Sequence, residues 1–289
     1  MPTLAGTISR SRKVKDRLFA IACFGATFSA AILLVILLWA VFRDGISRLS
    51  GDFFTSFTSR NPEDAGIKAA LFGTLWVVGL SALIAVPIGI AAAIYLEEWK
   101  LRKNWFTEFV QVNISNLAGV PSIVYGLLGL ALFVRWLDLG RSVLAGSLTM
   151  ALLILPMVII VSQEALRAVP GSFRDASYAL GATQWQTIRG QVLPSAFPGI
   201  LTGIILSVSR AIGETAPLIT IGAATYIASV PSSPGDRFTI LPLQIFNWSS
   251  APQKGFHEAA AAAIIVLLVV LLVLNSAAIL LRNRYSQRL

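Results

Sequence analysis

Long apolar runs separated by shorter polar segments dominate the chain. The first run is uncharged over 25 residues, which is long enough to cross a bilayer core and longer than the apolar region of a signal peptide. The pattern predicts an all-α integral membrane protein with six transmembrane helices, the first of them an uncleaved span. The expected spans lie at about 18–42, 69–96, 112–136, 143–162, 195–228 and 257–281.

Composition agrees with a membrane protein. Of the 289 residues, 56% are hydrophobic and 13% are charged, a balance that does not suit a surface exposed to water. The only cysteine, Cys23, lies inside the first apolar run, and His257 is the only histidine. We therefore expect neither a disulfide framework nor a bound metal.

The net charge of +9 follows membrane sidedness and does not indicate nucleic acid. With a cytoplasmic N-terminal tail, residues 1–17, the inside segments hold 14 Lys and Arg against 6 Asp and Glu, and the outside segments hold 8 against 7. The excess of positive charge predicts that both termini lie in the cytoplasm. The inside segments are 1–17, 97–111, 163–194 and 282–289, and the outside segments are 43–68, 137–142 and 229–256, with the span-end residues Arg135, His257 and Glu258 counted on that side.

The inside segment 163–194 is longer than a connection between neighbouring spans needs to be. Two capping patterns, Ser172 with Asp175 and Thr183 with Gln186, predict short helices from about 173 and 184, with Gly181 between them. Gly190 is expected to help end the second helix. Each helix has a small apolar stripe; the stripes are Phe173, Ala176 and Leu180, and Trp185, Ile188 and Val192. From the residues alone, a helix pair on the membrane surface and a pair docked in a partner's groove are equally good interpretations.

One motif favours the docked pair. The segment D-A-S-x-x-x-G followed, after nine residues, by Q-V-L-P resembles the E-A-A-x-x-x-G-x9-I-x-L-P loop of ABC importer permeases. Asp replaces Glu, Ser replaces Ala and Gln replaces Ile. The resemblance implies that the loop couples the chain to an ATPase. The residues to which it gives this role are Asp175, Ala176, Gly181, Trp185, Leu193 and Pro194.

Four separated blocks between residues 66 and 225 resemble the phosphate transport permeases of ABC importers: N-L-A-G-V-P-S-I-V-Y-G-L-L-G-L, E-A-L-R-A-V-P, L-G-A-T-Q-W-Q-T-I-R and R-A-I-G-E-T-A-P-L. This resemblance implies a type I ABC importer permease architecture. The implied partners are a second permease subunit, a dimer of ATP-binding subunits and a phosphate-binding protein outside. The sequence holds no G-x-x-x-x-G-K-[ST] pattern, so ATP and Mg²⁺ are expected in the partner ATPase and no cofactor in this chain.

The fifth apolar run contains Arg210 and, one helical turn later, Glu214. An arginine at mid-membrane costs about 2.5–3.5 kcal/mol on insertion scales, so it needs a partner or a wet cavity. The pair is either a buried ion pair that fixes helix orientation or an anion contact in a translocation path. Gly213 and Pro217 predict a kink or break just past the pair, which favours the path because freed backbone groups need protein or water.

The leading hypothesis is therefore the permease subunit of an ATP-driven phosphate importer. A permease for sulfate or molybdate is the nearest alternative. An integral membrane enzyme would use Glu214 as acid or base, but the sequence offers it no second carboxylate or activated nucleophile. A self-sufficient secondary transporter would leave the segment 163–194 without a purpose.

Overall fold

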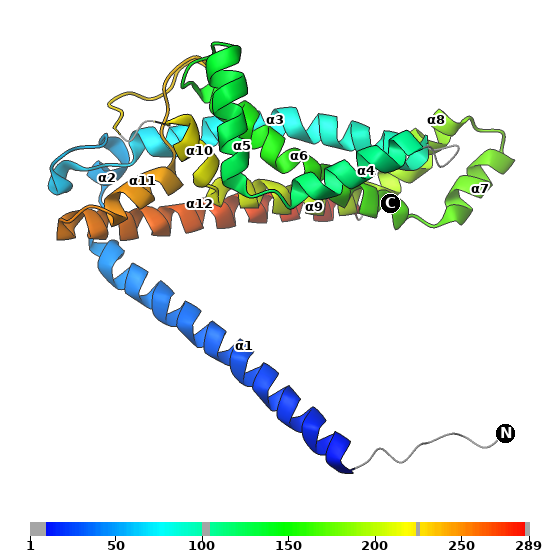
Figure 1. Ribbon diagram of the computed structural model, residues 1–289, viewed down its shortest axis with the longest axis horizontal. Coiled ribbons are helices and arrows are strands. Elements are labelled where there is room, and N and C mark those ends of the chain that lie inside the picture. The colour runs from blue at the N-terminus through cyan, green and yellow to red at the C-terminus, as the bar shows by residue number, and fades with distance from the viewer. Residues whose placement is uncertain (1–9, 100–104, 224–225, 287–289) are drawn as a thin grey trace.

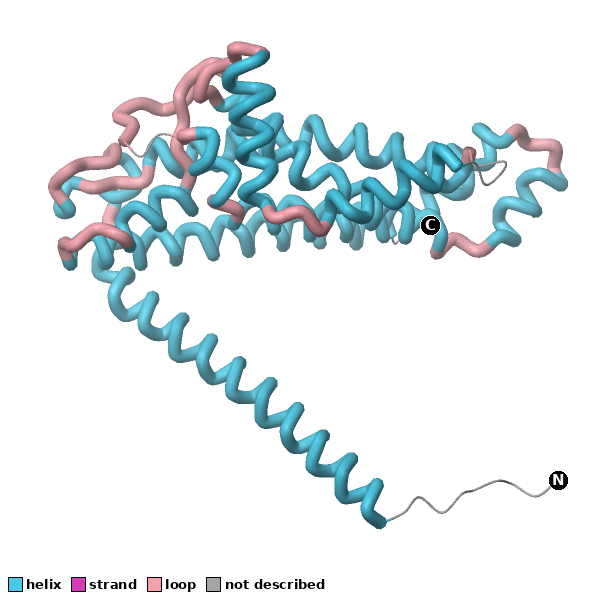
Figure 2. The backbone as a smooth tube through the Cα atoms, viewed as in Figure 1, coloured by secondary structure: helices cyan, strands magenta, loops and turns pink. Residues whose placement is uncertain are grey.

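The computed structural model describes residues 10–99, 105–223 and 226–286, and within these ranges all regular structure is helical (Figures 1 and 2). The elements are α1 (Arg10–Gly45), η1 (Ile46–Arg48), α2 (Gly51–Thr55), η2 (Pro62–Asp64), α3 (Lys68–Glu98), α4 (Trp105–Ala118), α5 (Ser122–Gly129), η3 (Leu130–Trp136), α6 (Val143–Arg167), α7 (Gly171–Ala179), α8 (Gln184–Thr187), η4 (Ile188–Val192), α9 (Leu193–Gly213), α10 (Ala216–Ile221), α11 (Leu241–Ser249) and α12 (Lys254–Ser286). Five helical segments are long and apolar enough to cross a membrane, and a bent pair can supply a sixth.

The long helices α3, α6, α9 and α12 form a bundle with α6 near its centre (Figure 1). In the most apolar part of α6, 67% of the residues are buried within the chain. Close approach depends on small residues: Gly199 and Gly203 of α9 face Ala165 and Val161 of α6 so closely that a Cβ atom at Gly203 would overlap the valine. Helices in membranes associate through such small-residue contacts because lipid supplies no hydrophobic drive between them.

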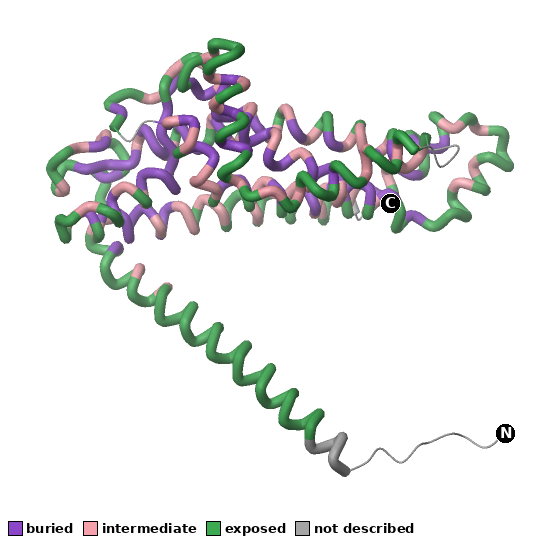
Figure 3. Tube along the Cα trace, viewed as in Figure 1, coloured by how far each residue is buried: buried purple, intermediate pink, exposed green. Residues whose placement is uncertain are grey.

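Helix α1 leaves the bundle and is exposed along nearly its whole length (Figure 3). The rest of the chain buries 0% of the residues in its most apolar part. Its last turn contacts α12, where Gly45 lies against the backbone of Ala261 and Ala262. A helix this apolar is not stable against water. Its surface is therefore available to lipid or to another subunit.

The polar segments sort to the two ends of the bundle. The elements η1, α2, η2 and α11, all from segments expected outside, gather at one end, and α7 and α8 lie at the other (Figure 1). This arrangement agrees with an odd number of crossings between the segment 163–194 and the segments expected outside.

The expected third span, 112–136, is not one straight helix. It is divided into α4 and the α5–η3 pair, and the two parts meet at 104°. The chain turns at Gly119, Val120 and Pro121, and Pro121 takes an extended conformation (ψ 135°) before α5 begins. Proline removes a backbone donor and disfavours helix at the preceding residue, so the helix stops there.

The expected fifth span, 195–228, differs at both ends. Helix begins at Gln184, because α8 and the π-helical segment η4 run directly into α9, and α9 ends at Gly213. The prediction that Gly190 ends a separate helix is wrong, since Gly190 lies inside η4. Of the remaining residues, α10 covers Ala216–Ile221, and 224–225 lie outside the described residues.

Candidate translocation path and coupling loop

The break in the fifth span lies at the charged pair itself. Helix α9 ends at Gly213, Glu214 is extended (φ −78°, ψ 126°), and α10 starts two residues later with Pro217 in its first turn. Proline is tolerated there because the first N–H groups of a helix have no intrahelical acceptor. The break therefore falls between Gly213 and Pro217, the two residues that predicted it, and it begins at Glu214 itself.

Arg210 and Glu214 form an ion pair, although Arg210 lies in a helix and Glu214 lies in the extended segment after it. Nε of Arg210, in the last turn of α9, lies 3.3 Å from Oε1 of Glu214, the first residue after the helix. Nη1 of Arg210 lies 3.3 Å from the sulfur of Met157 on α6. The arginine side chain is 50% exposed and the glutamate 19% exposed. The chain alone does not enclose the pair, so the guanidinium keeps free donors on the open side.

Helix α5 supports the short helix that follows the break. A Cβ atom at Gly126 of α5 would lie 2.7 Å from the backbone of Pro217 and 2.8 Å from the side chain of Thr220. The absent side chain lets α5 press directly against α10. Since α10 is six residues long, it depends on this packing more than on its own helical hydrogen bonds.

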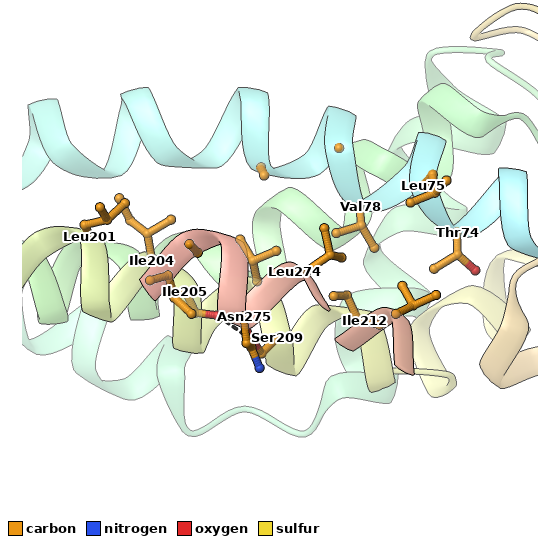
Figure 4. Close-up of a pocket in the computed structure, with 15 residues that line it drawn as sticks. Thr74, Leu75, Val78, Leu201, Ile204, Ile205, Ser209, Ile212, Leu274 and Asn275 are labelled. Atoms are coloured by element: carbon orange, nitrogen blue, oxygen red, sulfur yellow. Dashed lines mark hydrogen bonds between the residues drawn. The ribbon is translucent and has the colours of Figure 1, made fainter. Parts of the chain in front are cut away.

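The opposite face of α9 has a different character. There α9, α3 and α12 line a groove of about 300 Å³, and most of its side chains are apolar (Figure 4). Its main polar contact is the hydrogen bond from Ser209 to the amide oxygen of Asn275. An apolar groove between membrane helices suits lipid or another helix and offers an anion little. The face of α9 that carries Arg210 is therefore the better candidate for a polar path.

The segment 163–194, the candidate coupling loop, has the expected helix pair and one of its two expected caps. Thr183 and Gln186 form a complete capping box at α8, as predicted. The cap predicted at Ser172 is wrong: α7 starts at Gly171 after Pro170, and no side chain caps it. Gly181 separates the helices with φ +82°, a conformation that glycine adopts without strain.

The two apolar stripes are used differently. Ile188 and Val192 are fully buried under the bundle, so the second stripe fixes η4 in place. Leu180 is 89% exposed and Trp185 51% exposed, with the Trp185 ring 5.9 Å from that of Trp99. Asp175, Ala176 and Gly181 are also exposed, and Leu193 and Pro194 are half-buried. An exposed apolar patch on a loop of this kind is typical of an interaction surface.

A partly buried ion pair that the sequence did not reveal holds α7. The Arg174 side chain is 22% exposed and that of Glu98, at the end of α3, is 7% exposed; Nε of Arg174 lies 3.1 Å from Oε2 of Glu98. The same guanidinium donates to the backbone oxygens of Val169 (2.9 Å) and Leu166 (3.0 Å). Its hydrogen bond to Glu98 raises the pKa of Arg174 further above the ordinary value. The local sequence gives no sign of this contact, because its partners are 76 residues apart.

The bent bundle and its loop define an ABC importer permease. A family model described as "Binding-protein-dependent transport system inner membrane component" matches residues 85–288, and the chain belongs to this family. The resemblance inferred from the loop motif is thereby confirmed.

Curated relatives narrow the family further. The chain is 36% identical over 258 residues to "Phosphate transport system permease protein PstA 1" of Mycobacterium tuberculosis (strain CDC 1551 / Oshkosh), with 87% of this chain and 83% of that protein covered. It is 32% identical to PstA of Pasteurella multocida (strain Pm70), with 89% and 90% covered. It is also 36% identical to "Probable ABC transporter permease protein YqgH" of Bacillus subtilis (strain 168), with 78% and 75% covered.

Solved structures show the same fold at lower identity. A chain from an inward-facing MetNI methionine ABC transporter aligns with a TM-score of 0.63 at 15% identity, and 75% of this chain and 94% of that chain are covered. A chain of a bacterial ABC transporter for the acidic polysaccharide alginate aligns with a TM-score of 0.62 at 17% identity, covering 94% and 99%. Transport substrates differ within this fold, so substrate has to be argued from the site.

Proposed function

We propose that the chain is the permease subunit of an ATP-driven importer of inorganic phosphate and forms half of the translocation path. The observation that carries the proposal is Arg210, a half-exposed cation at a helix break inside an apolar span. A guanidinium offers a planar fork of donors that matches the oxygens of a phosphate ion. The phosphate permeases among the relatives support this choice of substrate.

Glu214 favours phosphate over fully ionised oxyanions. At neutral pH phosphate still carries an O–H group, which can donate to the carboxylate that lies beside the arginine. Sulfate has no such donor at this pH, so its oxygens would face the carboxylate of Glu214 without a hydrogen bond between them. We therefore rank a sulfate or molybdate permease second.

We extend the proposal to the remaining subunits, which would cover the open sides of the chain. A second, PstC-like permease supplies the other half of the path, opposite Arg210. Two PstB-like ATP-binding subunits bind ATP and Mg²⁺ and dock on the exposed patch around Leu180 and Trp185. A PstS-like phosphate-binding protein delivers the ion at the opposite end of the bundle. The chain itself has no enzymatic step to perform.

We assign the complex to a bacterial inner membrane, with both termini in the cytoplasm. The Lys and Arg excess of the inside segments supports this orientation. A reporter enzyme fused after Leu289 and active only in the cytoplasm should be active. An inactive reporter on an inserted, full-length protein would overturn the orientation.

Substitution of Arg210 by Gln tests the transport role. Glutamine keeps two donors and loses the charge, so ATP-dependent phosphate uptake should be lost while the complex still assembles. Lys254→Gln is the control, because Lys254 is 92% exposed and pairs with Glu258 at 4.0 Å, away from the break. Uptake at the parental rate by Arg210→Gln, at equal membrane abundance, would remove Arg210 from the path. Failure of that variant to assemble, with normal assembly of the control, would favour the alternative of a structural ion pair.

A further inference from the structure

A cationic cavity lies beside the C-terminal end of α10. It has a volume of about 420 Å³, and its polar lining comes from Arg141, Arg237, Tyr226 and Asn247. Arg141 precedes α6, and Arg237 lies in the loop before α11, so distant parts of the chain bring the two guanidinium groups to one cavity.

The described residues that line this cavity supply hydrogen-bond donors, but none of them is an acidic residue that could pair with the arginines. Among the described residues, neither Arg141 nor Arg237 forms an ion pair or a side-chain hydrogen bond, and no carboxylate lines the cavity. The amide nitrogen of Asn247 is buried and has no hydrogen-bond partner. A buried donor left unpaired costs about 1–3 kcal/mol, which a bound acceptor would recover.

Asp236, the acidic residue next to Arg237 in sequence, already has its own hydrogen-bond partners. The carboxylate of Asp236 accepts four hydrogen bonds, from the backbone N–H and hydroxyl groups of Ser232 and Ser233, at 2.7–2.9 Å. These bonds hold the pKa of Asp236 far below its ordinary value. Because the carboxylate is engaged by its own turn, it leaves the charge of Arg237 without a dedicated partner.

Gly222 places Arg141 at the end of α10. It ends the helix with φ +83°, and a Cβ atom there would lie 2.9 Å from Nε of Arg141. The cavity is therefore separated from Glu214 by one short helix. Six residues of α-helix span about 9 Å, so an anion in the cavity is one step from the deeper pair.

We propose that this cavity is an outer receiving site for a tetrahedral oxyanion, occupied by phosphate before it reaches Arg210. The inference rests on the proposed function and extends it to a path with a shallow site and a deep site. Two unpaired cations in one recess concentrate anions near the mouth of the path. The same chemistry would also bind the phosphate of a lipid headgroup, so the test has to separate the two sources.

Protection of a cysteine in the cavity measures occupancy directly and does not depend on uptake. The chain has one native cysteine, and Cys23→Ser gives a background for Ile219→Cys, a cavity position that is 41% exposed. Phe54→Cys, which is 40% exposed on α2 and does not line the cavity, is the matched control. The complete importer is used in nanodiscs of phosphatidylcholine, with inorganic phosphate as the ligand.

Phosphate should slow alkylation at position 219 and leave position 54 unaffected. At a phosphate concentration ten times that giving half-protection, the alkylation rate should fall about tenfold, as simple occupancy requires. Arg141→Gln combined with Arg237→Gln should abolish the protection, and the same two positions as Lys should retain part of it. Absence of protection in the parent, or protection that survives both glutamines, would overturn the proposal.

Two further arms separate the competing accounts. In nanodiscs that contain phosphatidylglycerol, slow alkylation without added phosphate and no further effect of phosphate would assign the cavity to lipid and overturn the proposal. Arg210→Gln should leave protection intact while uptake is lost. If Arg210→Gln instead retains uptake, the proposed role of Arg210 fails, and the protection result still decides the outer site on its own.

Discussion

The ion pair between Glu98 and Arg174 provides a quantitative test of how the coupling loop is held. Glu98→Gln removes the negative charge but leaves an oxygen that can still accept one of the bonds from Arg174. Because the pair is largely buried, the loss should resemble that of a hydrogen bond to a charged group, about 1.5–3 kcal/mol. Local opening of α7 should then become about 10- to 150-fold more frequent, since 1.4 kcal/mol is a factor of ten.

The neighbouring pair supplies a control of the same chemistry. Glu97 pairs with Arg167, whose side chain is 57% exposed. Exposed pairs contribute about 0–1 kcal/mol, so Glu97→Gln should change the opening of α7 by about fivefold at most. The two substitutions remove the same charge from adjacent residues and differ in burial and in the element that they hold.

Hydrogen exchange of the α7 amides in the assembled importer measures this opening. Glu98→Gln should also lower transport per ATP hydrolysed, because a loosened loop transmits less of the ATPase motion. Equal exchange rates in the Glu97 and Glu98 variants would refute the reasoning. So would fast exchange in Glu98→Gln with fully coupled transport, which would separate loop position from coupling.

Three further predictions concern packing, protonation and docking. Gly126→Ala should destabilise the chain by about 1–3 kcal/mol through overpacking against α10, whereas Gly79→Ala on α3, where a new Cβ meets nothing within 4 Å, should be neutral or stabilising in thermal unfolding. The pKa of Asp236 is lower in the folded protein than in the unfolded chain. The amides of its turn should therefore stay protected from hydrogen exchange at all pH values above about 4 and lose this protection only as the pH falls further. Asp236→Asn should reduce the same protection at pH 7. Trp185→Ala and Gly181→Asp should insert normally but recover less ATP-binding subunit on co-purification; full recovery with both would exclude the exposed patch as the docking surface.

Hydrophobic run length predicted the long helices well, because a span must satisfy its backbone within one helix whatever it packs against. The ends of α3 and α6 fall within a few residues of the expected runs at 69–96 and 143–162. Run length could not separate α9 from α10, since Glu214 and Thr215 interrupt the helix without interrupting the apolar character around them.

Contacts between segments that are distant in sequence could not be predicted from local sequence patterns. From sequence, Arg174 is one loop cation among several until α3 brings Glu98 beside it, and Arg141 and Arg237 come to one cavity only in the folded chain. The charged pair at Arg210 was visible from sequence because its partner is four residues away. A contact of that range needs no tertiary information.

The measurement that tests the central claim most directly is phosphate uptake by the exchanged variant Arg210→Glu with Glu214→Arg, in proteoliposomes that contain all subunits and ATP. The exchange can keep the ion pair but moves the positive charge from the last turn of α9 to the extended residue beyond it. If Arg210 contacts the permeating anion, the exchanged importer should assemble at the parental level and take up no phosphate. Uptake near the parental rate at equal abundance would contradict the account and leave the pair a structural role only.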